Sequence, residues 1–343
     1  MAKVLVTGAA GQVGCRLVRQ LLARNYEVRG LVLPGDPARS RLQGLELEVV
    51  EGDLLDPQVA EKALEGMDAA IHTANLVSPL PGMSEAAWFD NNVRTTFNIA
   101  RAAGRRADKL ARFVHISSSS LYPNDSHEVA PCYDPIDEVH PLRPRGVYAL
   151  SKLVGEDILW ATRRETGLRA TAIRPSGILS GDAVLRRWTV AFASIILKAG
   201  QAHPESALYR CEGGEPWTAL EAVARSADQP CAITDLQGRP WMYRPVDARD
   251  VAHGLICALE SPAAVGEAFN IAAPEPISYV EAAAILSERT GVPALSWQAP
   301  VRWVYDLSIV KARSLIDYRP RWGIREMIDD ALAVRRGESD GLS

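Results

Sequence analysis

The feature that most constrains the fold is a glycine-rich turn that begins at Gly8. A short apolar run over residues 4–6 leads into Gly8, Gly11 and Gly14, and apolar residues then recur at helical spacing over residues 17–22. This order predicts a strand, a tight turn and a helix. Gly8 can take a positive φ, Gly11 lets backbone approach an anion, and Gly14 lets the helix pack close to the strand. The turn therefore predicts a pyrophosphate site at the N-terminus of the helix.

The first half of the chain alternates between strand and helix patterns. Strands are predicted over residues 27–33, 45–50, 69–75 and 113–117, and helices over residues 57–64, 84–106 and 148–166. Such alternation predicts an α/β fold, a doubly wound parallel (Rossmann) sheet with helices on both faces. Ligands of such sheets bind at the carboxyl ends of the strands, so residues at strand ends are the first candidates for a site.

The second half is less regular. Residues 181–200 predict one helix with Trp188, Val190, Phe192 and Ile195 buried. Further helices are predicted near 217–225, over 250–260 and from 278, and a strand over 267–271. We expect a dinucleotide-binding domain made of residues 1–176 and 246–273, and a smaller substrate-binding lobe made of residues 177–245 and 274–343.

The end of the second strand leaves the choice of cofactor open. An acid there would bind the adenosine ribose 2′-OH of NAD, whereas an arginine would hold the 2′-phosphate of NADP. The chain has Val32 and Leu33 at this point, followed by Asp36, Arg39 and Arg41. Either Asp36 reaches the ribose, or the two arginines hold a phosphate, or all three are solvated loop charges. We expect NAD or NADP with modest discrimination.

Two more strand ends carry polar residues. Asp53 follows the third strand, where it either accepts from the adenine amino group or caps the helix that begins at Pro57. Four serines, Ser117 to Ser120, follow the fifth strand. Their place at the ligand edge favours a hydrogen bond to a substrate oxygen over a simple turn.

Tyr148 and Lys152 lie four residues apart at the start of a predicted helix and so share one face. An ammonium stabilises tyrosinate, so we expect Lys152 to lower the pKa of Tyr148 from its ordinary value of about 10. A general acid/base that works near neutral pH needs such a pKa. Many helices contain this spacing by chance, but the glycine turn and the strand-end serines make chance a poor explanation here.

Charge and composition argue against several classes. The 38 basic and 42 acidic residues give a net charge of −4 without a basic cluster, so nucleic acid is not expected as a partner. Five cysteines without a CxxC pair and six histidines without paired-ligand spacing predict neither disulfides nor a metal site, and a reducing cytoplasm fits them. The apolar run from Trp188 to Leu197 is too short to span a membrane, and a first strand that begins at about Ala2 leaves no room for a signal peptide.

Over roughly its first 180 residues the chain resembles the extended short-chain dehydrogenase/reductases of the NAD-dependent epimerase/dehydratase type. The matching motifs are Thr7-Gly8-Ala9-Ala10-Gly11-Gln12-Val13-Gly14 for TGxxGxxG, Asp53, His72-Thr73-Ala74, Asn92, the serines before Leu121-Tyr122, Tyr148 to Lys152 for YxxxK, and Arg174-Pro175-Ser176. The resemblance implies a Rossmann fold, NAD or NADP as cofactor, and a catalytic serine, tyrosine and lysine.

The resemblance implies that the catalytic residues are Ser118, Tyr148 and Lys152, with Ser119 as a second candidate for the hydroxyl. Together with the strand ends, it gives these cofactor-binding candidates: Gly8, Ala10, Gly11, Gln12, Val13, Asp36, Arg39, Asp53, Leu54, Thr73, Ala74, Asn92, Ser117, Tyr148, Lys152 and Pro175. The substrate-binding candidates are Ser119, Ser176 and Arg244.

Two departures from the family bear on the reaction. Dehydratases of the family carry an Asp-Glu pair where this chain has Ser119 and Ser120, which disfavours elimination of water. Many sugar-nucleotide epimerases hold the diphosphate with an arginine that Arg244 matches only if the alignment slips by one residue. We expect a sugar or sugar-nucleotide epimerase that works as a homodimer on a small sugar-like substrate. A sugar or polyol dehydrogenase or reductase is the alternative, and a catalytically silent NAD(P)-binding sensor is a third possibility.

Overall fold

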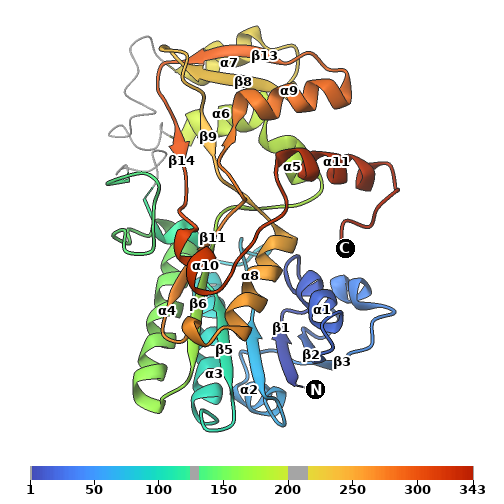
Figure 1. Cartoon of the computed structure of the whole chain (residues 1–343), viewed down its shortest axis with the longest axis vertical. Helices are drawn as coiled ribbons and strands as arrows, with labels where there is room; N and C mark the ends of the chain where they lie inside the picture. The colour runs from blue at the N-terminus through green and yellow to red at the C-terminus, as the bar shows by residue number, and fades with distance from the viewer. Residues whose placement is uncertain (1, 124–130, 200–214, 343) are drawn as a thin grey trace.

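A seven-stranded sheet forms the lower part of the molecule in Figure 1, a computed structural model that describes residues 2–123, 131–199 and 215–342. Its strands are β1 (Lys3–Thr7), β2 (Glu27–Val32), β3 (Glu48–Glu51), β4 (Ala69–His72), β5 (Arg112–Ile116), β6 (Ala170–Pro175) and β11 (Ala268–Ile271). They lie in the order β3-β2-β1-β4-β5-β6-β11, and each neighbouring pair is parallel. The predicted doubly wound parallel sheet is thus confirmed. The strand order reverses between β1 and β4, which is where sheets of this kind bind ligands.

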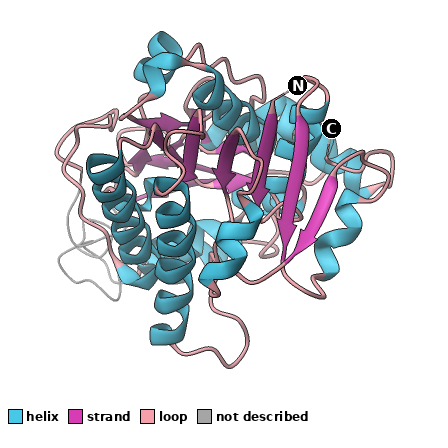
Figure 2. Ribbon diagram, turned by 90° about the horizontal axis from the view of Figure 1, so that it is seen from below, coloured by secondary structure: helices cyan, strands magenta, loops and turns pink. Residues whose placement is uncertain are grey.

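Helices cover both faces of the sheet, as the view from below in Figure 2 shows. One face packs against α2 (Pro57–Ala63), α3 (Glu85–Gly104) and α4 (Gly146–Thr166), and the other against α1 (Gly14–Leu22) and α8 (Ala248–Glu260). The alternation of side chains along β1 serves both faces. Leu5 packs into the cluster with α2, α3 and α4, whereas Val4 and Val6 pack into the cluster with α1 and α8.

The upper part of the molecule in Figure 1 holds smaller sheets and their helices. Its elements are α6 (Val190–Ala199), α7 (Pro216–Val223), β8 (Cys231–Asp235), β9 (Met242–Tyr243), β12 (Ile277–Ser278), α9 (Tyr279–Thr290), β13 (Leu295–Ala299) and β14 (Val304–Tyr305). Its core is aromatic, because Trp188, Trp241 and Tyr279 are fully buried and meet edge to face. The predicted division into two domains stays a prediction.

The remaining elements are η1 (Pro37–Leu42), η2 (Ser119–Leu121), β7 (Ile178–Leu179), α5 (Asp182–Arg187), β10 (Val246–Asp247), η4 (Pro262–Ala264), α10 (Val310–Leu315) and α11 (Ile324–Arg335). In the described part of the chain, no helix is both long and apolar enough to cross a membrane.

The single helix predicted over residues 181–200 is wrong, because the chain forms α5 and α6 with a break at Trp188 and Thr189. At the break the backbone pairs with the segment that leads into β8. The Trp188 carbonyl accepts from Cys231 N–H at 2.9 Å, and Val190 N–H donates to the Gln229 carbonyl at 2.9 Å. Trp188 and Val190 are buried as expected, but Ile195 is 59% exposed.

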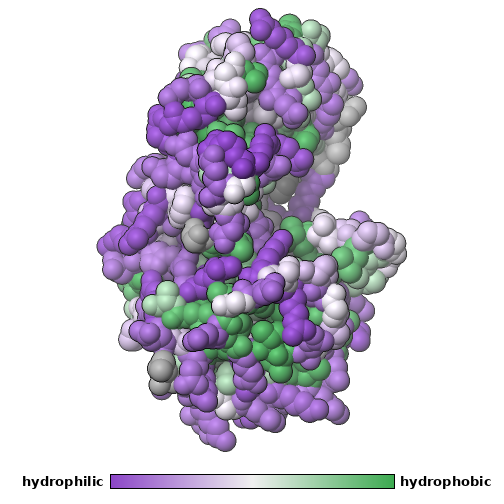
Figure 3. Space-filling view, turned by 90° about the vertical axis from the view of Figure 1, so that its right-hand side faces the viewer, coloured by the Kyte–Doolittle hydropathy of each residue, from purple (hydrophilic) through white to green (hydrophobic). Residues whose placement is uncertain are grey.

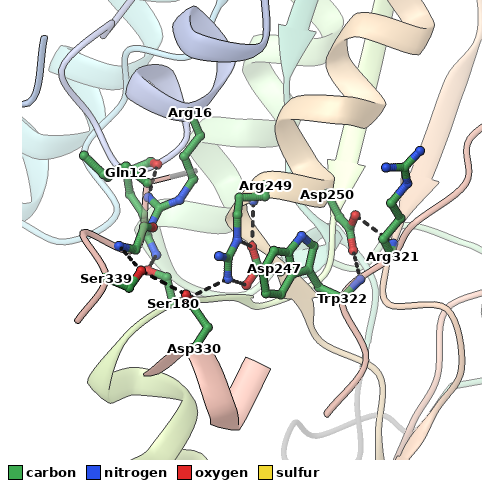
Figure 4. Close-up of polar contacts among 12 residues, drawn as sticks. Gln12, Arg16, Ser180, Asp247, Arg249, Asp250, Arg321, Trp322, Asp330 and Ser339 are labelled. Carbon is green, nitrogen blue, oxygen red and sulfur yellow. Dashed lines mark hydrogen bonds and ion pairs between the residues drawn. The ribbon is translucent and has the colours of Figure 1, made fainter. Parts of the chain in front are cut away.

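Charged side chains hold the C-terminal segment to helices α1 and α8 (Figure 4). Arg249 pairs with Asp247 at 2.8 Å and with Asp330 at 2.9 Å, and its guanidinium lies 3.2 Å from the centre of the Trp322 ring. Arg16 donates to the Gln12 carbonyl at 2.7 Å and also to the Gly341 carbonyl. Residues near both ends of the chain therefore meet beside the glycine turn.

Two buried histidines stack inside the sheet. His72 on β4 and His115 on β5 have ring centroids 5.4 Å apart, and His72 Nδ1 lies 2.8 Å from the Thr7 hydroxyl. Neither ring nitrogen of His115 has a hydrogen-bond partner among the described residues. Burial, and then the nearby Lys152, lower the pKa of His72 to about 3 and hold the pKa of His115 well below its ordinary value.

These histidines predict that the protein loses stability in mild acid. Their pKa values are lowered on folding, so the unfolded chain binds more protons once the pH falls through about 6.5. For His72 alone, the loss between pH 7 and pH 5 is about 2 kcal/mol of unfolding free energy. Denaturant unfolding of the wild type and of His115→Phe at both pH values measures it. We expect the variant to lose less stability than the wild type, and equal losses would contradict the prediction.

Candidate active site

A cavity of about 560 Å³ lies at the carboxyl ends of β1, β4, β5 and β6. It extends from the glycine turn through Ser117–Ser120, Tyr148 and Lys152 to Tyr243 and Trp303. The space-filling view in Figure 3 shows the surface indented between the lower and upper parts of the molecule. Among the described residues that line this cavity, no aspartate or glutamate occurs.

The glycine turn has the backbone geometry predicted for it. Gly8 has a φ of 66°, and a Cβ built on it would lie 2.9 Å from Ala74 Cα. A Cβ on Gly14 would lie 2.1 Å from the Gly8 carbonyl oxygen, so both positions exclude a side chain. Gly8, Gly11, Gln12 and Val13 line the cavity. α1 begins at Gly14, so the positive end of its dipole faces the turn and suits an anion, and the Cys15 N–H at its start donates to the Gly11 carbonyl at 3.1 Å.

The neighbouring strand ends leave polar atoms for a ligand. Thr73 lines the cavity, and its hydroxyl donates to the Thr7 carbonyl at 2.7 Å. Asn75 Oδ1 and the Ser117 hydroxyl are buried, line the cavity and have no hydrogen-bond partner among the described residues. Buried polar atoms are normally satisfied, so this half of the cavity fits a polar dinucleotide.

The three predicted catalytic residues come together in the cavity. The Ser118 hydroxyl makes a hydrogen bond with Tyr148 and accepts from Ser120 N–H at 3.1 Å. Lys152 Nζ lies 5.8 Å from the centre of the Tyr148 ring and donates to the Ile116 carbonyl at 2.9 Å. Helix α4 supplies the tyrosine and the lysine, and the end of β5 supplies the serine and the carbonyl.

The pKa values correct one expectation. Burial raises the pKa of Tyr148, and the Ser118 hydrogen bond opposes that rise. Burial also lowers the pKa of Lys152 to about 7, against the attraction of Glu156. The predicted lowering of the Tyr148 pKa by Lys152 is therefore not found. Since burial disfavours both the ammonium and the tyrosinate, Lys152 carries much less of its charge near neutral pH than an exposed lysine would.

A buried ion pair anchors α4, the helix that carries Tyr148 and Lys152. The Arg174 guanidinium on β6 donates to both carboxylate oxygens of Glu156 on α4, at 2.8 and 2.7 Å. It also donates to the Tyr122 hydroxyl at 2.8 Å, and that hydroxyl donates to Asn270 Oδ1 on β11 at 2.9 Å. The resemblance drew attention to Arg174 and, more loosely, to Asn270, but Glu156 carried no signal in the sequence.

Two of the residues predicted to bind the adenosine end of the cofactor already bond to other parts of the protein. Asp36 accepts from Ala38 N–H at 2.9 Å and caps η1, and Arg39 pairs with Glu51. Arg41 is better placed than Arg39, because its guanidinium donates to the Ala10 carbonyl of the glycine turn at 3.1 Å. Ala10 itself does not line the cavity.

At the third strand end, the alternative that Asp53 caps the next helix is wrong. Asp56 caps α2 by accepting from Gln58 N–H at 2.8 Å. Asp53 instead accepts from Leu55 N–H at 2.9 Å, and Leu54 is buried in the core. Asp53 and Leu54 do not line the cavity, and their proposed contacts with adenine stay predictions.

The structure corrects the role of Asn92. Its side-chain amide accepts from the Leu76 N–H at 3.0 Å and donates to the Leu76 carbonyl at 2.9 Å, and it also donates to the Ser151 hydroxyl at 3.3 Å. These bonds use the amide to fix the loop after β4 against α4. Asn92 is 1% exposed and does not line the cavity, so it positions the loop and does not touch the cofactor space.

The structure also corrects the role of Arg244. Its guanidinium donates to the carbonyls of Ala273, Leu307 and Pro274 at 2.9, 3.1 and 2.6 Å, and pairs with Asp306 at 3.3 Å. Arg244 does not line the cavity. It therefore joins segments of the smaller part of the molecule and is not available to hold a diphosphate.

The substrate end of the cavity is mostly apolar. The substrate-binding candidates Ser119 and Ser176 and the cofactor-binding candidate Pro175 line the cavity, and their roles stay predictions. The Ser120 and Ser176 hydroxyls have no partner among the described residues. The other lining side chains at this end are Ile178, Arg187, Phe192, Ile195, Ile196, Ala199, Tyr243, Trp303 and Tyr305. The Tyr243 hydroxyl lies against Gly177, where an added Cβ would be 1.9 Å from it. Sequence reasoning missed Arg187, which stands in the run Leu185-Arg186-Arg187-Trp188 without a motif around it.

A family model described as "NAD dependent epimerase/dehydratase family" matches residues 4–272. A curated 3 beta-hydroxysteroid dehydrogenase/Delta 5-->4-isomerase from Mycobacterium tuberculosis is 34% identical over 200 residues, which is 54% of this chain and 50% of that protein. The chain spans about half the length of the curated relatives it matches.

Among solved structures, a short-chain dehydrogenase/reductase superfamily protein from Agrobacterium tumefaciens with bound NAD covers 98% of both chains at 26% identity, with a TM-score of 0.75. The UDP-glucuronic acid 4-epimerase of Bacillus cereus in complex with NAD has the same fold, with a TM-score of 0.70 at 20% identity over 98% of this chain and all of that one.

We predict that NAD and NADP bind with affinities within a hundredfold of each other, or about 2.7 kcal/mol. Arg41→Ala should weaken NADP binding about three- to tenfold more than NAD binding, because Arg41 lies at the glycine turn. Arg39→Ala is the matched control, since Glu51 already pairs with it. Titration calorimetry with both cofactors measures these ratios. A larger preference, or a greater effect of Arg39→Ala, would show that another contact decides cofactor choice.

Proposed function

The chain belongs to the NAD dependent epimerase/dehydratase family and is an NAD(P)-dependent enzyme, and we infer from its site that it interconverts a secondary alcohol and a ketone on a hydrophobic substrate. The observation that carries this inference is the set of apolar side chains that lines the same cavity as Ser118 and Tyr148. A cavity of this kind selects its substrate by apolar surface and fixes it with few polar groups.

The described residues suit the reaction as follows. In the direction of oxidation, Tyr148 takes the proton of the substrate hydroxyl, and Ser118 holds the reacting oxygen by a hydrogen bond. Lys152 favours the deprotonated tyrosine when it carries its proton. The nicotinamide, when bound, supplies the two-electron acceptor for the hydride of the carbinol carbon. One alcohol and one oxidised cofactor thus give one ketone, one reduced cofactor and one proton.

Two further observations support a dehydrogenase or reductase over the epimerase expected from the sequence. Arg244 is committed to protein carbonyls and Asp306, so the predicted grip on a sugar-nucleotide diphosphate is missing. The relative from Mycobacterium tuberculosis is named for a dehydrogenase that acts on a hydroxysteroid, a largely apolar alcohol.

A sugar or sugar-nucleotide epimerase is the second candidate. The unpartnered hydroxyls of Ser120 and Ser176 in the cavity favour it, because they suit a substrate with several hydroxyl groups. The two candidates differ in their effect on the cofactor. A dehydrogenase produces reduced cofactor in proportion to substrate, whereas an epimerase inverts a carbon and returns the hydride. The cytoplasmic location and the homodimer stay predictions.

We predict that Tyr148→Phe lowers turnover by about 10² to 10⁴, because it removes the acid/base while keeping the ring. Cofactor reduction is followed at the nicotinamide band with hydroxysteroids, aromatic alcohols and nucleotide sugars, and sugar inversion is followed separately. NAD(P) affinity and thermal stability should stay unchanged. Tyr26→Phe is the matched control and should be fully active, because the Tyr26 hydroxyl donates to Glu260 and Tyr26 does not line the cavity. Full activity of Tyr148→Phe would refute the catalytic assignment, and inversion of a nucleotide sugar without net reduction would favour the epimerase.

A further inference from the structure

Arg187 forms the centre of an aromatic cage at the substrate end of the cavity. It is the last residue of α5 and is 7% exposed. Its guanidinium carbon lies 3.7 Å from the ring centre of Tyr243, 4.0 Å from that of Phe192 and 5.5 Å from that of Trp303. All four residues line the cavity, and together we call them the arginine cage.

The charge of Arg187 has no counterion in the described part of the chain. Its guanidinium makes no hydrogen bond and no ion pair there, and its Nε is buried without an acceptor. Trp303 Nε1 is likewise buried without one. Arg174, Arg244 and Arg249 are buried to a similar degree, and each of them pairs with a carboxylate. Arg187 differs from these three in lacking an anionic partner among the described residues; Arg112 on β5 also lacks one, but Arg112 does not line the cavity.

The geometry of the cage leaves the N–H groups of Arg187 for a ligand. Aromatic rings stabilise a guanidinium through its flat faces, but they accept no ordinary hydrogen bond from the donors at its edge. A buried donor without an acceptor is unfavourable, and Arg187 and Trp303 bring such donors to one place. A carboxylate matches this arrangement, because its two oxygens accept from a guanidinium side by side.

The rest of the cavity indicates what the carboxylate is attached to. Among the described lining residues the cations are Arg187 and Lys152, and Lys152 lies at the reacting end, where it donates to the Ile116 carbonyl. One free guanidinium balances one negative charge, whereas a phosphate monoester carries about −1.5 to −2 at pH 7. The side chains of Ile178, Ile195 and Ile196 also line the cavity and contribute apolar surface to it.

We propose that the substrate is a hydrophobic hydroxy acid or keto acid, and that Arg187 in the arginine cage binds its carboxylate while Ser118 and Tyr148 meet its alcohol or ketone. This proposal rests on the proposed function and adds to it the charged group that the substrate carries. It makes Arg187 a specificity-determining residue, with no part in proton or hydride transfer.

The test compares a hydrophobic acid with its uncharged ester. The probes are dodecanoate and methyl dodecanoate, kept below the concentrations at which they aggregate, and binding to the NAD-loaded protein is measured by titration calorimetry. We expect dodecanoate to bind at least tenfold more tightly than the ester, which corresponds to about 1.4 kcal/mol. Arg187→Met should remove this difference by weakening the acid while leaving the ester within about twofold. Arg187→Lys should keep part of it, because it keeps the charge without the planar fork.

The controls separate this proposal from protein stability and from the proposed reaction. Arg186→Met changes the exposed neighbour on the same helix and should leave both affinities unchanged. Tyr148→Phe should keep the preference for the acid even though it loses turnover, so a failure of the proposed function and a failure of this proposal are distinguishable. NAD affinity and thermal stability of each variant are measured first.

Three results would overturn the proposal. One is equal binding of acid and ester by the wild type, or no binding of either probe. Another is an equal loss of affinity for both probes in Arg187→Met with thermal stability unchanged, which would show that the cage contributes only apolar surface. The third is tighter binding of dodecyl phosphate than of dodecanoate in an Arg187-dependent manner, which would assign the cage to a phosphate ester.

Discussion

The position of α4, which carries Tyr148 and Lys152, depends on the ion pair between Arg174 and Glu156. The pair joins β6 to α4 in a place where Glu156 is 2% exposed, and Tyr122 and Asn270 extend it to the chain after the serine run and to β11. Glu156 lies one turn from Lys152 and two turns from Tyr148 on the same helix. Removing one partner of a buried ion pair typically costs about 3–5 kcal/mol of unfolding free energy. Through Tyr122 and Asn270 this pair therefore holds four segments together, namely β6, α4, the chain after the serine run and β11. The tyrosine and the lysine meet the strand-end serine because this set holds their helix against the sheet.

Burial also sets the protonation states beneath the site. His72, His115 and Lys152 share one dry region, and each has a lowered pKa for which burial is the main cause. Two neutral imidazoles next to Lys152 place polar groups there without adding positive charge. A second positive charge in this buried region would cost free energy beyond that of a charged Lys152. The low dielectric constant there strengthens the interaction of a charged Lys152 with Tyr148.

The sequence predicted the parts of the structure that depend on local pattern and on order along the chain. Strand and helix alternation was sufficient for the sheet, and the glycine turn and the Tyr148–Lys152 spacing picked out segments that line one cavity. The break between α5 and α6 could not be predicted, because it comes from backbone pairing with a segment about forty residues later. Arg244, Asn92 and Arg187 show the same limit. A polar residue type says nothing about whether distant carbonyls, a neighbouring loop or aromatic rings will surround it.

Gly177, which has no side chain, leaves space that a large aromatic side chain of the site fills. The Tyr243 hydroxyl occupies the space that a side chain at 177 would need, and Arg187 rests on the face of that same tyrosine ring. The positions of the Tyr243 and Arg187 side chains thus depend on the missing Cβ at residue 177, whereas Ser118 and Tyr148 belong to other elements. A different residue at position 177 in a relative would therefore change the shape of the substrate end of the cavity and leave the chemistry of Ser118 and Tyr148 unchanged. The half of the site that shapes the substrate end thus depends on Gly177, separately from the half that holds Ser118 and Tyr148.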